Sequence, residues 1–145
     1  MNSDCAVYTV SCVVRERVKR PPRISKPDDV AKIMAKRMET LEQEYFYTLL
    51  LNTKNELIAA ELISVGSLNA TIVHPREILK PAILHSAANI IVTHNHPTGD
   101  PTPSSEDIEF TRRLAKCAEL IGIGLLDHVV LGKDDFASLK EGGYF

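Results

Sequence analysis

The sequence predicts an α/β (α+β) fold, a mixed β-sheet flanked by helices, and two observations carry this prediction. The apolar runs at 44–51 and 57–65 are separated by turn residues, which is typical of a β-hairpin. Further along the chain, segments of strand composition alternate with segments of helical period, which places helices against a sheet. The 145 residues, 44% hydrophobic and 25% charged, fit one globular domain.

The first half of the chain begins with a predicted strand at Val7–Val14, which is rich in β-branched residues. A helix is expected to open at Lys26-Pro27-Asp28-Asp29, because acids in a first turn interact favourably with the helix dipole. Its apolar stripe comprises Val30, Ile33, Met34 and Met38. The predicted hairpin follows, with Asn52-Thr53-Lys54-Asn55 as its turn.

In the second half, a proline at position 75 predicts the start of a helix after a short strand at Ala70–Val73. Pro81 lies inside the helical pattern, so this helix is expected to be kinked or to restart there. The remaining expected elements are a buried strand at Asn89–Thr93, a helix from about Ser104 to Ile121, a strand at Leu125–Leu131 and a short tail at Phe136–Phe145.

Charge is distributed unevenly along the chain, and this suggests a division into residues 1–26, a strand with a basic, Pro-rich linker, and residues 27–145, the domain. The stretch Arg15–Lys26 carries six basic residues and one acid, so it is +5 while the rest of the chain is −7. Such a stretch could make weak contact with nucleic acid, or it could be a solvated linker without an aromatic residue to stack on a base. Both interpretations stay open.

Targeting and redox features are few. The apolar runs are too short to span a bilayer and the first residues do not resemble a secretory signal, so we expect a cytoplasmic protein without a membrane partner. Three cysteines without a C-x-x-C pair disfavour a disulfide framework or a thiolate zinc finger.

The informative motif is His94-x-His96-x7-Ser104-x-x-Asp107, which starts at a strand end and finishes in the first turn of a helix. Side chains two residues apart on a strand point the same way, so both imidazoles can meet one ion. Asp107 continues the row Phe110, Leu114, Cys117 and Ile121, the predicted core stripe of the helix. A buried carboxylate needs a partner, and two histidines with one carboxylate are typical of catalytic zinc.

A simpler interpretation exists for each part of this motif. Ser104 and Asp107 have the spacing of a helix-capping arrangement. The other histidines, His74, His85 and His128, are interpreted as structural or surface residues. The full spacing is harder to obtain from capping and chance than any of its parts.

The motif resembles the signature of the JAMM (MPN-plus) metalloproteases, whose JAB/MPN fold is similar to that of the cytidine deaminases. The segments Gly66–Leu68, Val73–Ile78, His94–Pro101 and Leu125–His128 resemble, more closely, the JAB-like domain of the RadC (UPF0758) family. This resemblance covers about residues 27–145. Longer members carry a helix-hairpin-helix region ahead of the domain, so this chain is expected to be a short form.

The resemblance implies a zinc-dependent hydrolase that cleaves a peptide or isopeptide bond in a peptide or protein substrate. It implies Zn²⁺ held by His94, His96 and Asp107, with Glu44 as general base and Ser104 as the oxyanion donor. Glu61, in the next strand, is the alternative base. Two other functions remain: a DNA-repair-associated or nucleic-acid-binding accessory protein, or a metal-binding interaction module without catalysis.

Overall fold

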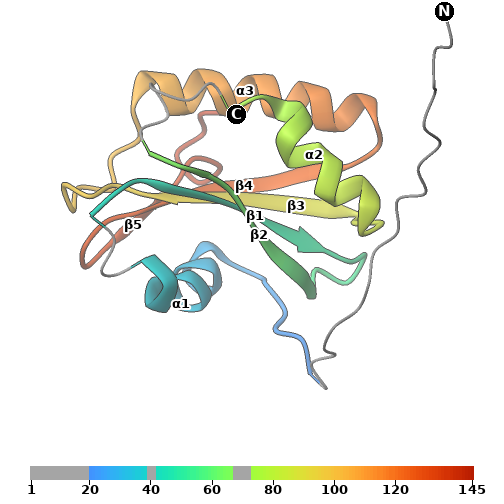
Figure 1. Cartoon of the computed structure of the whole chain (residues 1–145), viewed down its shortest axis with the longest axis horizontal. Coiled ribbons are helices and arrows are strands. Elements are labelled where there is room, and N and C mark those ends of the chain that lie inside the picture. The colour runs from blue at the N-terminus through green and yellow to red at the C-terminus, as the bar shows by residue number, and fades with distance from the viewer. Residues whose placement is uncertain (1–19, 39–41, 67–72) are drawn as a thin grey trace, which may run out of the picture.

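The computed structural model describes residues 20–38, 42–66 and 73–145, and in these ranges the chain forms a five-stranded sheet with three helices (Figure 1). The helices are α1 (Pro27–Met38), α2 (Pro75–Leu84) and α3 (Ser105–Leu120). The strands are β1 (Tyr45–Leu51), β2 (Leu57–Val65), β3 (Asn89–Asn95), β4 (Gly124–Leu131) and β5 (Phe136–Ser138). The predicted α/β fold is confirmed.

The sheet is mixed, with strand order β2-β1-β3-β4-β5. All neighbouring strands are antiparallel except β3 and β4, which run parallel and are joined through α3. A parallel pair needs a crossover of this kind, and it brings the start of α3 near the end of β3. The register Phe46↔His94 then places the beginning of β1 beside the end of β3. Three segments that are distant in the sequence, the start of β1, the end of β3 and the start of α3, therefore meet at one end of the central strands.

Helices cover both faces of the sheet, with α2 and α3 on one face and α1 on the other (Figure 1). Adjacent residues of a strand consequently belong to different cores. Leu50 and Ile90 pack in the core under α2 and α3, whereas their neighbours Leu49 and Ile91 pack in the core over α1. The central strands therefore read as continuous apolar runs, which is the pattern of strands buried on both faces.

Most predicted elements are confirmed, and three details need correction. The predicted tail contains β5, which pairs with β4 and which is too short to show a period in the sequence. The predicted core stripe of the last helix is wrong at Ile121, which follows α3 as its C-cap and is 48% exposed. Phe110 and Cys117 are half-buried, and Thr111 and Ala118 take fully buried positions.

Other expectations concern the N-terminal half. Pro81 lies inside α2, which continues through it without a restart. The predicted strand at Val7–Val14 and residues 70–72 of the one at Ala70–Val73 lie outside the described residues. At the described end of the basic segment, Leu57 donates a backbone hydrogen bond to the Pro22 carbonyl and Ile24 to that of Asn55, both at 2.9 Å. The division of the chain at residue 26 stays a prediction.

Within the three described ranges, the structure contains no helix that is both long and apolar enough to cross a membrane.

Substitution of Met34 tests how much the core over α1 contributes to stability. Its side chain is fully buried, whereas Lys36 on the same helix is exposed. We expect Met34→Ala to lower the free energy of unfolding by about 2–5 kcal/mol, because it removes buried apolar surface and leaves a cavity. Lys36→Ala should change it by less than about 0.5 kcal/mol. Urea unfolding of the two variants beside the wild type measures both values, and equal effects would contradict this packing.

Candidate metal centre

Four side chains converge where β1, β3 and α3 meet: Glu44, His94, His96 and Asp107. One ligand atom from each lies within 4.8 Å of the others. Glu44 directly precedes β1, the two histidines lie at the end of β3, and Asp107 lies in the first turn of α3. The structure thus brings together the three predicted metal ligands and the predicted general base.

The shortest contacts of this group involve the Nε2 atoms of its histidines. His94 Nε2 lies 3.0 Å from His96 Nε2, 3.4 Å from Asp107 Oδ1 and 3.6 Å from Glu44 Oε1. His96 Nε2 lies 3.5 Å from Asp107 Oδ2. His94 and Asp107 form the buried side of the group, whereas the side chains of His96 and Glu44 are 18% and 16% exposed.

Asp107 also caps α3, so the capping interpretation and the inward carboxylate both hold. Its Oδ2 accepts a hydrogen bond from the Ser104 backbone N–H at 2.8 Å, and its own N–H donates to Ser104 Oγ at 3.1 Å. This reciprocal pair is a capping box. Ser104 is therefore the N-cap of α3, placed three residues before Asp107 but outside the group of four.

Asn95, between the two histidines, holds Glu44 in place. Its Oδ1 accepts from the Tyr45 N–H at 2.7 Å, and its Nδ2 donates to the Gln43 carbonyl at 2.9 Å. These two bonds fasten the backbone on both sides of Glu44 to the residue that separates the histidines. Asn95 is 4% exposed, so its side chain makes both bonds from a buried position.

The protonation of His96 follows from its second ring nitrogen. His96 Nδ1 lies 2.8 Å from the Asp100 carbonyl, which can only accept, so Nδ1 carries a proton and neutral His96 has a bare lone pair on Nε2. The hydrogen bond with Asp107 raises the pKa of His96 above its ordinary value. Burial alone would raise the pKa of Asp107, but the imidazoles of His94 and His96 beside it outweigh burial and hold that pKa well below its usual range. The carboxylate is therefore ionised.

This donor set fits a divalent metal ion. An ionised carboxylate, a second carboxyl group and imidazole nitrogens converge on one another, and such acceptors repel unless a proton or a cation lies between them. Imidazole nitrogen and carboxylate oxygen are the ligands that zinc takes in catalytic sites. The hydrogen bonds that the ligands make on their outer sides, such as that of His96 to Asp100, are typical of metal-binding histidines.

His128 is the residue that the sequence prediction underestimated. It is buried, as a structural residue would be, but its Nε2 lies 2.8 Å from Nδ1 of His94, so it contacts a predicted ligand directly. Burial lowers its pKa well below the ordinary value, with a further contribution from His94. A histidine inside the apolar run Leu125–Leu131 was the available signal, because a fully buried imidazole requires hydrogen-bond partners.

Glu61, the alternative base, lies elsewhere. Its Oε1 is 3.4 Å from His85 Nε2, and its side chain is 41% exposed. It is outside the group of four. On geometry, Glu44 is the carboxylate that faces the histidines.

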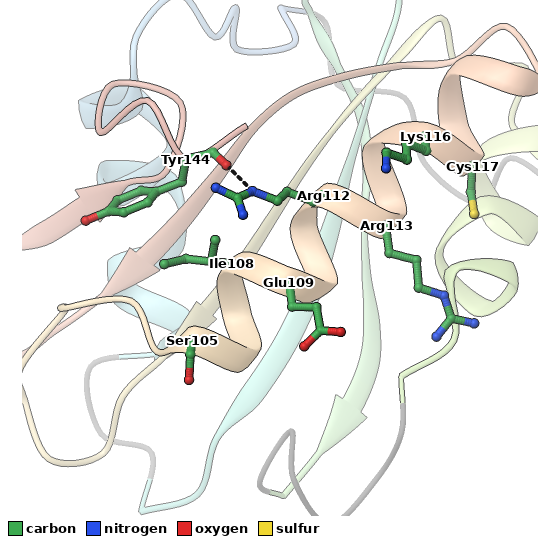
Figure 2. A pocket seen from close by; sticks show the side chains of 8 residues that line it. All are labelled: Ser105, Ile108, Glu109, Arg112, Arg113, Lys116, Cys117 and Tyr144. Carbon is green, nitrogen blue, oxygen red and sulfur yellow. Dashed lines mark hydrogen bonds between the residues drawn. The ribbon is translucent and has the colours of Figure 1, made fainter.

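A groove of about 930 Å³ runs along the outer side of α3 from Ser105 to Cys117 (Figure 2). Its cationic residues are Arg112, Arg113 and Lys116, and Glu109 is its acid. Arg112 Nε donates to the Tyr144 carbonyl at 2.7 Å, which fastens the C-terminal residues to the helix (Figure 2).

The fold and the group of four define a class of protein: an α/β domain with a candidate metal centre at the end of its parallel strand pair. Comparison with known families gives the family. Residues 24–144 match the RadC-like JAB domain, so the chain belongs to that family, as the sequence resemblance implied.

Similar proteins are known from several bacteria. A UPF0758 protein of Geobacillus sp. (strain WCH70) is 57% identical over 121 residues, covering 83% of this chain and 54% of the relative. A UPF0758 protein of Bacillus cereus (strain G9842) is 51% identical over 132 residues, covering 91% and 59%. The UPF0758 protein YsxA of Bacillus subtilis (strain 168) is 56% identical over 121 residues, covering 83% and 52%. The chain spans about half the length of these relatives.

Asn95 provides a test of how Glu44 is held. We expect Asn95→Leu to free the backbone around Glu44, so that the Tyr45 amide exchanges with solvent much faster than in the wild type. The two lost hydrogen bonds should lower the free energy of unfolding by about 1–3 kcal/mol. Amide hydrogen exchange measures the effect, with the Leu49 amide inside the β1–β3 ladder as internal control. Unchanged protection at Tyr45 would show that Asn95 does not fasten this segment.

Proposed function

We propose that this domain is a zinc-dependent hydrolase that cleaves a peptide or isopeptide bond. His94, His96 and Asp107 would hold the ion, and Glu44 would act as general base. The observation that carries the proposal is the convergence of these four side chains from three separate elements. Membership of the RadC-like JAB domain family supports it.

Zinc, when bound, supplies Lewis acidity, which polarises a carbonyl group and lowers the pKa of water to about 7. The protein's part in the reaction is to position groups and move protons. Glu44 lies on the partly exposed side of the group, and its Oε1 is 3.6 Å from His94 Nε2. A carboxylate there can take a proton from an attacking water and deliver it to the leaving amine. Asn95 keeps it in place through the backbone on both sides.

Exposure indicates the side from which a substrate would approach. His94 and Asp107 are sealed by the sheet and α3, with side chains 0% and 2% exposed, whereas His96 and Glu44 border the solvent. Ser104, half-buried at the N-cap of α3, accepts a hydrogen bond from the Asp107 N–H. A hydroxyl at this position would stabilise an oxyanion developing on the substrate.

Glu44→Gln separates catalysis from metal binding. We expect it to keep about one Zn²⁺ per chain and to abolish hydrolysis, because the amide keeps the shape of the carboxylate and cannot take a proton. His96→Ala should lose both metal and activity, and Ser104→Ala should keep the metal and lose about 10²–10³ in rate. Elemental analysis gives the metal content, and a peptide and isopeptide library screened with the wild type supplies the substrate.

Glu61→Gln is the matched control, since Glu61, on β2, is also a glutamate near a histidine. It should keep both metal and activity. Full activity in Glu44→Gln, or equal trace metal in the wild type and His96→Ala, would refute the proposal. A wild type that binds zinc and cleaves no member of the library would favour a metal-binding module without catalysis.

A second candidate function is binding of nucleic acid, and the groove along α3 is the observation that favours it. Arg112, Arg113 and Lys116 line it on one helix face, and cations so arranged attract phosphate groups. Residues 20–26 of the basic segment Arg15–Lys26 lie on the α1 side of the sheet, where Ile24 packs, so they do not extend this groove.

Charge reversal tests this second function. Under it, Arg113→Glu with Lys116→Glu should weaken binding of a single-stranded oligonucleotide at low salt at least tenfold. The matched control is Lys36→Glu with Arg37→Glu, a pair that is also exposed and lies on α1 at the opposite face of the sheet. Fluorescence anisotropy measures the affinity. Equal affinities in both double variants would show that the groove does not bind nucleic acid.

A further inference from the structure

A chain of buried polar groups lies behind His94, on the side away from the group of four. His128 on β4 and Thr111 on α3 are both 0% exposed. His94 Nδ1 lies 2.8 Å from His128 Nε2, His128 Nδ1 lies 2.5 Å from Thr111 Oγ1, and Thr111 Oγ1 donates to the Asp107 carbonyl at 2.6 Å. The chain therefore starts on one candidate ligand and ends on the backbone of another.

Each proton in this chain has one possible position. The Asp107 carbonyl can only accept, so the single hydroxyl proton of Thr111 points to it. The Thr111 oxygen must then accept from His128, which places the proton of that imidazole on Nδ1. Because His128 is fully buried, a charged imidazole is disfavoured there, so its Nε2 has no proton and accepts from Nδ1–H of His94.

We propose that Thr111 and His128 are positioning residues that fix His94 as its Nδ1–H tautomer, which turns a bare Nε2 lone pair toward His96, Asp107 and Glu44. This inference rests on the proposed function for its purpose, because a metal-binding histidine must present an unprotonated nitrogen to the ion. Thr111 contacts the backbone carbonyl of Asp107 rather than one of the converging ligand atoms, and it acts on His94 through His128.

The same chain also connects the two elements that carry ligands. Through it, β3 with His94 is bonded by way of β4 to the first turn of α3, which carries Asp107. The Phe46 ring stacks on His94 at 5.9 Å between centroids and meets His128 edge-on at 5.7 Å. The apolar Phe46 ring thus covers the hydrogen-bonded imidazoles, so water competes poorly for their hydrogen bonds.

Thr111→Val tests the proposal, because valine keeps the shape of threonine and removes the hydroxyl. His128 then loses the acceptor for Nδ1–H and is expected to shift to its Nε2–H tautomer. That proton would face Nδ1 of His94 and drive the His94 proton to Nε2. Thr111→Ser, which restores a hydroxyl, should rescue the wild-type state.

Two measurements on the full chain decide the question. ¹⁵N–¹H NMR of the metal-free protein reports the tautomer of His94, which we expect to be Nδ1–H in the wild type and Thr111→Ser and Nε2–H in Thr111→Val. Titration with Co²⁺, followed by its visible absorption, should show an affinity about 10–100-fold lower in Thr111→Val than in the wild type. Thermal melts confirm that each variant is folded.

Thr93→Val is the matched control. Thr93 on β3 is also fully buried, and its hydroxyl finds no hydrogen-bond partner among the residues that the structure describes. This variant should keep both the wild-type tautomer and the wild-type Co²⁺ affinity. A folded Thr111→Val with His94 still in the Nδ1–H form would overturn the proposal. A wild type without Co²⁺ affinity would refute the proposed function, while the tautomers would still decide the inference.

Discussion

The Nε2 atoms of His94 and His96 lie 3.0 Å apart, and the arrangement of the neighbouring side chains at this end of the domain depends on this contact. Two imidazole nitrogens approach so closely only when a proton or a cation lies between them. The outer nitrogen of each ring is engaged elsewhere, His96 with the Asp100 carbonyl and His94 with His128, so both Nε2 atoms face the place where a cation could bind. The Asp107 carboxylate then supplies a negative charge on the same side.

The sheet topology makes this contact possible. The parallel pair β3 and β4 requires a crossover, and α3 is that crossover, so its first turn lies where β3 ends. The antiparallel pairing of β1 with β3 brings Glu44 to the same point. Asn95 forms hydrogen bonds to the backbone on both sides of Glu44. Asp107 accepts a hydrogen bond from the backbone of Ser104, the N-cap of α3. Fold and site therefore share the same hydrogen bonds.

The sequence predicts the parts of this structure that depend on local pattern. The hairpin, the helix α3 and the ligand motif follow from period, turn residues and spacing, and the structure confirms the first two and brings the motif together. The sequence pattern does not predict β5, because a strand of three residues is too short to show a period. The role of His128 also escapes it, since that role comes from the pairing of β4 with β3, a contact between residues 34 positions apart. Ile121 is misassigned because a helical period does not show where the helix leaves the core.

The position of the site beside an apolar core bears on how metal binding and folding are linked. His94 and Asp107 are buried beside the core under α2 and α3, and Phe46 of that core stacks on His94. The cores provide apolar burial that does not depend on an ion. Bound metal would then add to a stability already present, by an amount set by its concentration relative to Kd. A structural zinc site differs here, because its binding energy is the folding energy. The two cores can thus form without an ion, and a bound ion would relieve the repulsion among the four converging acceptors.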